Sequence, residues 1–381
     1  EIRLSLVGSE MCIRDSPKGV YFTHRQLVLH TLGVSTIMGA IDSVRLLGTN
    51  DVYMPITPMF HVHAWGLPYV ATMLGLKQVY PGRYDPEYLV ELWRREKVTF
   101  SHCVPTILQM VLNAKAAQGT DFGGWKIVIG GSALNRALYE AAKAKGIQLT
   151  AAYGMSETGP LVSCAHLNDE LMAGSEDERT TYRIKAGVPG PLVEAAIIDA
   201  EGNFLPADGE AQGELVLRAP WLSEGYFNEP QKGAELWEGG WLHTGDVATL
   251  DSMGVIDIRD RIKDVIKTGG EWISSLDLED LISRHAAVRE VAVVGIADPQ
   301  WGERPFALLV IREGHEIGAR ELKEHLKPFV ELGHLSKWAI PSQIALVTEI
   351  PKTSVGKLDK KRIRVDISEW QASNSTFLST L

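Results

Sequence analysis

The fold is decided by residues 126–159, KIVIGGSALNRALYEAAKAKGIQLTAAYGMSETG, in which two apolar runs flank an alanine-rich segment. The two runs, residues 126–131 and 147–153, are expected to form buried strands, and residues 135–145 a helix. A strand, a helix and a second strand in this order are typical of a parallel sheet. Ligands of such sheets bind beyond the carboxyl ends of the strands, so we expect a site around Gly130 and Tyr153.

The flanking sequence extends this pattern. Residues 85–97 predict an amphipathic helix, and residues 98–104 a further strand. Residues 184–250 consist of short strands and glycine turns, whereas residues 173–183 are expected to form a charged surface loop.

A second unit is expected to begin near Lys263, after a charged segment. Its predicted elements are strands at 288–296, 305–311 and 343–347 and a helix at 319–330. The predicted fold class is therefore α/β, with a large α/β domain at residues 17–262 and a smaller α+β domain at residues 263–381.

The composition is that of an ordinary globular protein, with 45% hydrophobic and 23% charged residues. The net charge of −10 argues against a broad nucleic-acid-binding surface but not against a local nucleotide pocket. Cys12, Cys103 and Cys164 lack metal-ligand spacing, and we interpret them as reduced thiols of a cytosolic protein. No apolar run reaches the length needed to span a bilayer.

Three separated segments carry candidate chemistry, although each also has a structural explanation. Lys18 precedes a predicted helix, where it could bind phosphate or lie in a solvated loop. Residues 152–159 bring together a ring, a hydroxyl and a carboxylate, which suits adenine, phosphate and Mg²⁺; a tight turn capped by Ser156 is the alternative. Asp246 can accept hydrogen bonds from a ribose diol with Arg261 supporting it by charge, although alone it indicates a turn.

Two further features are less specific. Lys357 lies in a small, glycine-containing loop, where a lysine is usually solvated. His61 and His63 form a pair without a third ligand nearby, which is a poor zinc signature, so we interpret them as the lining of a binding site.

Taken together, in this order and at these separations, the segments resemble the adenylate-forming (AMP-binding) superfamily of acyl-CoA synthetases, adenylation domains and luciferases. The resemblance runs from Pro17 to about Arg364. Residues 58–68, 101–106 and 269–275 are most similar to medium- and long-chain fatty acyl-CoA synthetases. The resemblance implies the adenylate-forming fold, with a large N-terminal domain and a mobile C-terminal domain that carries a catalytic lysine.

The matching positions imply a role for each candidate residue. Tyr153 would stack on adenine, Asp246 and Arg261 would grip the ribose, and Gly270 would contribute to thioester formation. The full set implied to bind ATP or coenzyme A is Gly131, Ser132, Ala133, Tyr153, Gly154, Asp246, Arg261, Gly270 and Lys18. The implied catalytic residues are Lys357, Glu157, which would hold Mg²⁺, and Ser156, which stands where the family usually has threonine.

The same resemblance implies which residues bind the acyl group and which residue acts as the hinge between the domains. His61 and Trp65 would border the acyl tunnel, with the tryptophan as a gate, and Val104 and Thr106 would line its wall. Lys263 stands at the position of the family's hinge.

The resemblance implies a fatty acid–CoA ligase that converts ATP, a fatty acid and coenzyme A into acyl-CoA, AMP and pyrophosphate through an acyl-adenylate. ATP, Mg²⁺ and coenzyme A are the expected cofactor and co-substrates, and no nucleic-acid partner is expected. A cytoplasmic location is expected, with peripheral membrane contact and a homodimer left open. The alternatives are another adenylate-forming ligase, for an aromatic or a short sulfur-containing acid or in a peptide synthetase, and an inactive nucleotide-binding fragment.

The beginning of the sequence departs from the family pattern. The family has a loop rich in serine, threonine and glycine directly before Pro-Lys-Gly, whereas this chain has MCIRDS at residues 11–16. Met11, Ile13 and Arg14 are too bulky for the close approach of backbone amides to phosphate that glycine allows. Our hypothesis is that residues 1–16 are not native and that the chain is truncated at its N-terminus.

Overall fold

The protein is described by a computed structural model, in which residues 18–40, 45–353, 356–372 and 377–378 are placed. The chain divides into two compact units. Unit 1 is residues 1–244, 248–258 and 354–357, and unit 2 is residues 245–247, 259–353 and 358–381. The predicted domain division at residue 263 stays a prediction.

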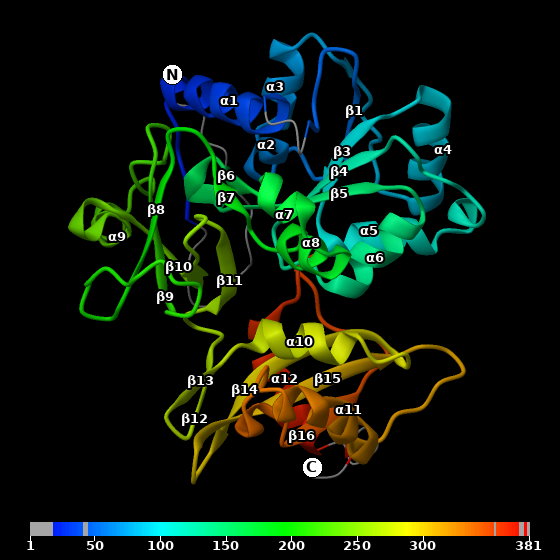
Figure 1. Ribbon diagram of the computed structural model, residues 1–381, viewed down its shortest axis with the longest axis vertical. Helices are drawn as coiled ribbons and strands as arrows, with labels where there is room; N and C mark the ends of the chain where they lie inside the picture. Colours follow the sequence, from blue (N-terminus) through cyan, green and yellow to red (C-terminus); the bar gives the residue numbers. More distant parts are fainter. Residues whose placement is uncertain (1–17, 41–44, 354–355, 373–376, 379–381) are drawn as a thin grey trace. The chain divides into compact units, whose positions relative to one another are not determined.

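Unit 1 contains a mostly parallel sheet (Figure 1). Its strands, in spatial order, are β2 (Lys77–Gln78), β1 (Val52–Pro55), β3 (Phe100–Cys103), β4 (Lys126–Ile129), β5 (Gln148–Gly154), β6 (Leu161–Cys164) and β7 (Val188–Pro189). The strands from β2 to β5 run parallel, and β6 and β7 pair antiparallel. The predicted strands at 126–131 and 147–153 are thus confirmed.

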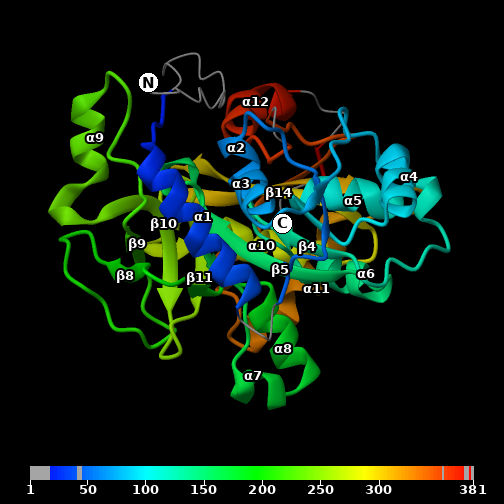
Figure 2. The ribbon, with the colours of Figure 1, turned by 90° about the horizontal axis from the view of Figure 1, so that it is seen from above.

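Helices cover both faces of this sheet (Figure 2). In β4, Ile127 and Ile129 pack into the core under one set of helices, and Val128 packs into the core on the other face. This alternation is expected because successive side chains of a strand point to opposite faces. The first face is covered by α4 (Pro86–Glu96), α5 (Pro105–Asn113) and α6 (Arg136–Ala144), and the second by α1 (His24–Gly39) and α3 (Leu67–Met73).

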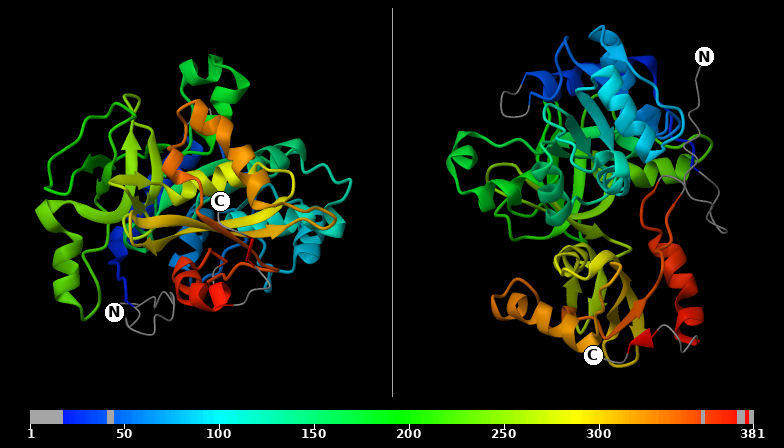
Figure 3. Two further views of the ribbon diagram at one scale, coloured as in Figure 1. Left: turned by 90° about the horizontal axis from the view of Figure 1, so that it is seen from below. Right: turned by 90° about the vertical axis from the view of Figure 1, so that its right-hand side faces the viewer.

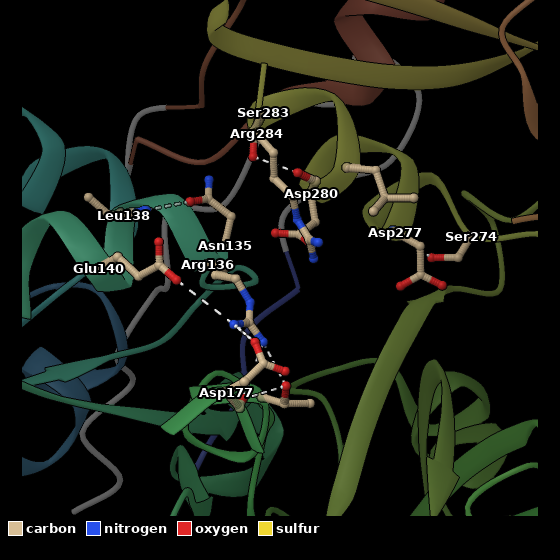
Figure 4. Close-up of polar contacts among 12 residues, drawn as sticks. Asn135, Arg136, Leu138, Glu140, Asp177, Ser274, Asp277, Asp280, Ser283 and Arg284 are labelled. Atoms are coloured by element: carbon tan, nitrogen blue, oxygen red, sulfur yellow. Dashed lines mark hydrogen bonds and ion pairs between the residues drawn. The ribbon is translucent and has the colours of Figure 1, made fainter. Parts of the chain in front are cut away.

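Polar caps explain where several of these helices begin. Thr23 and Gln26 form a capping box at α1, and the side chain of Asp85 caps α4 by accepting from the N–H of Tyr88. Asn135 caps α6 by accepting from the N–H of Leu138, as Figure 4 shows. These bonds satisfy N–H groups that have no partner within the helix.

The expectation of a loop at residues 173–183 is wrong, because most of this segment is helical. Helix α7 (Asp169–Ala173) is followed by α8 (Glu176–Arg183). Ser175 caps α8 by accepting from the N–H of Glu178, and three acidic residues in its first turn complement the helix dipole. Arg136 of α6 donates to Asp177 at 2.6 Å, which ties α8 to the helix beside it (Figure 4).

A second sheet follows in the chain, in the spatial order β11 (Ile256–Arg261), β10 (Leu242–Leu250), β9 (Gly213–Arg218) and β8 (Glu194–Ile198). Trp221, which is fully buried, packs into the core of this region with Leu215 and Leu217 of β9. Helix α9 (Pro230–Leu236) contributes Leu236 to the same core.

Unit 2 is a sheet with helices on both faces (Figure 3). Its strands are β12 (Ile266–Thr268), β13 (Glu271–Ile273), β14 (Val288–Asp298), β15 (Gly302–Ile311), β16 (Gln343–Leu346) and β17 (Phe377–Leu378). Val293 packs in the core with α10 (Ser275–Ser283) and α11 (Ala319–Glu331), whereas Val294 packs with Ile363 of α12 (Lys360–Ala372). The predicted strands and helix of this unit are confirmed, and β15 begins three residues earlier than expected because it pairs with β14 along a long hairpin. Within the described ranges, no helix combines the length and the apolar character needed to cross a membrane.

Candidate active site

The carboxyl ends of three parallel strands meet at one edge of the unit 1 sheet. β3 ends before Val104, β4 before Gly130, and β5 at Gly154. A Cβ atom on Gly131 would lie 3.2 Å from Cγ1 of Val104 and 3.1 Å from Cε of Lys357. Gly131 also has φ 81°, a left-handed backbone that favours glycine, and the space around it is tight.

Lys357 lies against this edge of the sheet, as part of the short segment that belongs to unit 1. Thr106 at the start of α5 donates from Oγ1 to the carbonyl oxygen of Gly356 at 2.8 Å, which fixes the backbone next to the lysine. The structure therefore brings together Gly131, Val104, Thr106 and Lys357, four residues that the sequence assigned to the site.

His61 and Trp65 border the same region. Burial, with a smaller contribution from the charge of Lys357, lowers the pKa of His61 to about 4. His61 is therefore neutral at pH 7 and adds no charge beside the lysine. A Cβ atom on Gly130 would lie 2.9 Å from the carbonyl oxygen of Ala152, so the neighbouring strand excludes a side chain here, and the Trp65 ring lies in contact range at 3.4 Å.

The backbone that carries Trp65 is unusual. Val62, His63, Ala64 and Trp65 have φ angles of 46°, 52°, 48° and 61°, and Gly66 follows with 71°. Left-handed backbone costs a residue with a side chain about 1–2 kcal/mol, so four such residues in succession form a strained turn. The surrounding core holds it, since Val62, Ala64 and Trp65 are all buried.

Two buried residues beneath Trp65 were missed by the sequence analysis. The ring of His102 lies 4.9 Å from that of Trp65, and its Nε2 is 2.8 Å from the hydroxyl of Tyr53. Burial lowers the pKa of His102 to about 3, so this histidine is neutral. A histidine and a tyrosine in two different strands give no local signal, because parallel pairing alone brings them together.

The end of β5 and the turn after it carry several of the residues predicted to bind the nucleotide. Tyr153 and Gly154 end the strand, and Ser156 and Glu157 lie in a short 3-10 turn, η2 (Ser156–Thr158). All four are half-buried. Ser132 and Ala133 are exposed in the connection between β4 and α6, at the same edge of the sheet.

Glu157 has a partner that the sequence did not indicate. The hydroxyl of Tyr226 donates to Oε1 of Glu157 at 2.6 Å, and the backbone N–H of Ser223 donates to the carbonyl oxygen of Glu157 at 2.8 Å. Lys18 is exposed, and its Nζ lies 4.8 Å from the centre of the Tyr226 ring. Residues 222–227 thereby connect Lys18 and Glu157, two residues that the sequence placed in separate motifs.

The remaining candidate residues lie in unit 2. Asp246 in β10 is buried, and its Oδ1 is 3.4 Å from Nε of the exposed Arg261. Lys263 is exposed in the turn that follows β11, and its carbonyl oxygen accepts from Arg364 at 3.5 Å. Gly270 is exposed in the turn between β12 and β13, with φ 87°.

Comparison with known proteins identifies the family. The family model described as AMP-binding enzyme matches residues 16–227, and the model described as AMP-binding enzyme C-terminal domain matches residues 277–357. This chain belongs to the AMP-binding enzyme family. The resemblance seen in the sequence is thus confirmed.

Individual members of the AMP-binding family agree with this assignment. The chain is 43% identical over 91% of its length to a long-chain-fatty-acid–CoA ligase of Thermus thermophilus, and 38% identical over 93% to a 3-methylmercaptopropionyl-CoA ligase of Ruegeria lacuscaerulensis. It covers 63% and 64% of these two proteins.

The fold agrees with that of solved members. The amide bond synthetase McbA from Marinactinospora thermotolerans superposes with a TM-score of 0.80 at 26% identity, over 92% of this chain and 67% of that one. The predicted fold class, an adenylate-forming α/β fold with a large N-terminal domain and a small α+β C-terminal domain, is confirmed.

Some predictions fall outside the described residues. They are the hypothesis that residues 1–16 are not native, the resemblance at Pro17 and the interpretation of Cys12 as a reduced thiol. Cys103 and Cys164 are described, and both are free and buried, with burial raising the pKa of each thiol to about 12.

Proposed function

We propose that the protein to which this chain belongs is a fatty acid–CoA ligase, which activates a fatty acid with ATP and transfers the acyl group to coenzyme A. The observation that supports this most is the position of Lys357, beside Gly131 at the strand ends, with His61 and Thr106 next to it. At this edge a lysine, glycine-containing backbone and apolar side chains lie close together. Such a site can bind a carboxylate and a nucleotide at the same time.

The nucleotide would bind along the strand ends. Tyr153 would stack on adenine, with Gly131, Ser132, Ala133 and Gly154 along the adenosine, because these residues leave backbone accessible at the end of β4 and β5. The hydroxyl of Ser156 would contact the α-phosphate, and Lys18 would contact the phosphates further along.

Lys357 would act on the first half-reaction. A carboxylate oxygen attacks the α-phosphorus, the bond to the bridging oxygen breaks, and pyrophosphate leaves with the electron pair. Two anions must approach, so the ammonium group of Lys357 would stabilise the charge that builds up on the transferred phosphate. His61 beside it is neutral and does not repel the ammonium group.

The described residues fit a Mg²⁺ ion that is bound mainly through substrate. They contain no group of three histidine, cysteine or acidic side chains that could enclose a metal. Mg²⁺ at phosphate-transfer sites is typically held by one or two carboxylates together with phosphate oxygens, and Glu157 offers one carboxylate. When bound, the ion would neutralise part of the phosphate charge.

Asp246, Arg261, Lys263 and Gly270 would serve the ribose and the second half-reaction. Asp246 would accept from the ribose hydroxyls, with Arg261 at 3.4 Å supporting it by charge. Lys263 would be the hinge, and Gly270, with no side chain, would leave room for coenzyme A to approach. The thiol of coenzyme A would then attack the acyl carbon and release AMP.

A fatty acid is the proposed substrate for two reasons. The most similar relatives named above include a long-chain-fatty-acid–CoA ligase, and a medium-chain-fatty-acid–CoA ligase of Ectopseudomonas oleovorans is 36% identical over 92% of this chain. Trp65 and Val104 are buried apolar side chains beside the site and would form the wall of an acyl tunnel. A short sulfur-containing acid is the second candidate, which the 38% identity to the Ruegeria ligase supports.

The substrate is tested by competition. Octanoate, hexadecanoate, trans-cinnamate and 3-methylmercaptopropionate are supplied together at equal concentration with ATP, Mg²⁺ and coenzyme A, and the thioesters are separated by mass. The proposal predicts that the octanoyl and hexadecanoyl thioesters exceed the other two by at least about tenfold. A dominant 3-methylmercaptopropionyl or cinnamoyl thioester would overturn the fatty-acid assignment.

We propose a cytoplasmic location, which the two buried free thiols support. Peripheral contact with a membrane, where fatty acids partition, is part of the same proposal, and so is a homodimer. Sedimentation with and without lipid vesicles measures both.

A further inference from the structure

The carboxylate of Glu157 is held by a tyrosine. The hydroxyl of Tyr226 lies 2.6 Å from Oε1 of Glu157, which is a short bond of the kind that a charged acceptor makes. A tyrosine hydroxyl carries its proton at neutral pH, so the Tyr226 hydroxyl is the donor and the Glu157 carboxylate is the acceptor.

The loop around Tyr226 holds the backbone of Glu157 as well. The N–H of Ser223 donates to the carbonyl oxygen of Glu157 at 2.8 Å. Ser223 is itself fixed, because its Oγ donates to the carbonyl oxygen of Gly225 at 2.9 Å and its carbonyl oxygen accepts from Nε1 of Trp237 at 2.9 Å. The side chain and the backbone carbonyl of Glu157 are thus both hydrogen-bonded to the loop at residues 223–226.

The same loop also binds the segment that carries Lys18. The N–H of Phe227 donates to the carbonyl oxygen of Gly19 at 2.7 Å, and Val20 and Tyr226 form a β-bridge. The Lys18 ammonium lies 4.8 Å from the centre of the Tyr226 ring, within the range of a cation–π contact. The two functional parts of Tyr226, its hydroxyl and its ring face, therefore serve two different groups.

We infer that Tyr226 is a positioning residue that orients Glu157 toward the metal ion and holds Lys18 beside it. This inference rests on the proposed function, in which Glu157 binds Mg²⁺. A hydrogen bond to Oε1 restrains the carboxylate and leaves Oε2 available, so Glu157 would present that oxygen to the ion when it is bound. Such partners of a metal ligand typically change metal affinity by about 10–100-fold when removed.

Two substitutions separate the two parts of the residue. Tyr226→Phe removes the hydroxyl and keeps the ring under Lys18, whereas Tyr226→Leu removes both. As a control, Tyr80→Phe removes a tyrosine hydroxyl that donates to Gln78 at 2.7 Å on the exposed surface.

The first readout is binding rather than activity. Mn²⁺ is titrated into the protein in the presence of ATP, and free Mn²⁺ is followed by electron paramagnetic resonance. Tyr226→Phe should weaken Mn²⁺ binding about tenfold and leave the affinity for ATP without metal within about twofold. Tyr226→Leu should weaken both, and Tyr80→Phe neither.

A second readout is the Mg²⁺ dependence of ATP–pyrophosphate exchange. In Tyr226→Phe the Mg²⁺ concentration at half-maximal rate should rise about tenfold, with the KM for the carboxylic acid unchanged. Tyr226→His, which keeps a ring N–H as donor, should recover part of the loss, and it carries the test if the phenylalanine variant does not fold.

The outcomes distinguish the inference from the proposed function. If Glu157→Gln weakens Mn²⁺ binding and Tyr226→Phe does not, Tyr226 does not position the carboxylate and the inference is wrong. If Glu157→Gln itself leaves Mn²⁺ binding unchanged, the assignment of the metal to Glu157 is wrong.

Discussion

Three buried, neutral histidines in unit 1, His30, His61 and His102, make its stability depend on pH. His30 accepts from the N–H of Leu161 at 3.1 Å, and His102 contacts Tyr53; burial lowers the pKa of each to about 3, against an ordinary value of 6.5. Below pH 6.5 the unfolded chain binds protons that the folded chain does not. The contribution of these neutral histidines to the free energy of unfolding is therefore fully present above pH 6.5 and is lost as the pH falls toward 3.

The pH prediction is quantitative. Between pH 6.5 and pH 5 each of these histidines should lower the free energy of unfolding by about 2 kcal/mol, at 1.36 kcal/mol per pH unit. Urea denaturation at pH 7 and pH 5, followed by tryptophan fluorescence, measures the difference. His102→Gln should remove at most about a third of the pH dependence, because His30 and His61 contribute as well. His24→Gln, at an exposed position, should remove none. If the free energy of unfolding changes equally between pH 7 and pH 5 in the wild type and in His102→Gln, the account is contradicted.

Lys357 offers a prediction about one half-reaction. Lys357→Ala should slow acyl-adenylate formation by roughly 10²-fold or more, because the transferred phosphate loses its cation. Thioester formation from a supplied acyl-adenylate should stay within a few-fold of the wild type. Lys352→Ala, in the same stretch of chain but paired with Glu290 at 2.7 Å, is the matched control. Equal loss of both half-reactions would count against a role specific to adenylation.

At the scale of elements, the turn at residues 62–66 has a strained backbone, and this strain should lower the stability of the fold by a measurable amount. Ala64 is buried and has φ 48° and ψ 47°, whereas Ala71 is equally buried in the regular helix α3. Glycine at 71 loses a buried methyl group and helix propensity, about 2 kcal/mol together. Glycine at 64 loses the methyl group but relieves left-handed strain, so the two effects nearly cancel.

Urea denaturation of Ala64→Gly and Ala71→Gly tests this difference. We expect Ala64→Gly to stay within about 0.5 kcal/mol of the wild type and Ala71→Gly to be about 2 kcal/mol less stable. Equal destabilisation by the two substitutions would show that the turn is not strained.

The elements also show what the sequence could predict. The strands and helix at residues 126–153 were predicted because their hydrophobic periods of 2 and 3.6 are clear. Helix α8 was missed because its charged composition outweighed the cap at Ser175 in the interpretation. The turn at residues 62–66 was not predictable, since left-handed backbone without glycine is imposed by packing. The contact between Glu157 and Tyr226 joins residues 69 positions apart and leaves no local pattern.

At the scale of the molecule, the proposed hinge is open to test. Asp264 and Val265 donate backbone hydrogen bonds to the carbonyl oxygen of Arg261, so Lys263 lies inside a tight turn. Proline at position 263 restricts both its own backbone and that of Ile262. Lys263→Pro should therefore impair the overall reaction more than adenylation.

The hinge prediction is measured by two assays on one preparation. In Lys263→Pro, ATP–pyrophosphate exchange should stay within a few-fold of the wild type, and acyl-CoA formation should fall at least about tenfold. Lys263→Ala, which keeps backbone freedom, should behave like the wild type in both. Near-normal acyl-CoA formation in the proline variant would contradict a hinge at this residue.

The central claim is that the protein activates a fatty acid as its adenylate, and fatty-acid-dependent ATP–pyrophosphate exchange tests it most directly. The assay uses this chain and a chimera in which the segment of the Thermus thermophilus relative that precedes the matching lysine is joined at Lys18. Exchange that requires a fatty acid of medium or long chain, and that Lys357→Ala reduces by roughly 10²-fold, is the predicted result. No exchange with any fatty acid, from chimera and chain shown to be folded, would contradict the claim.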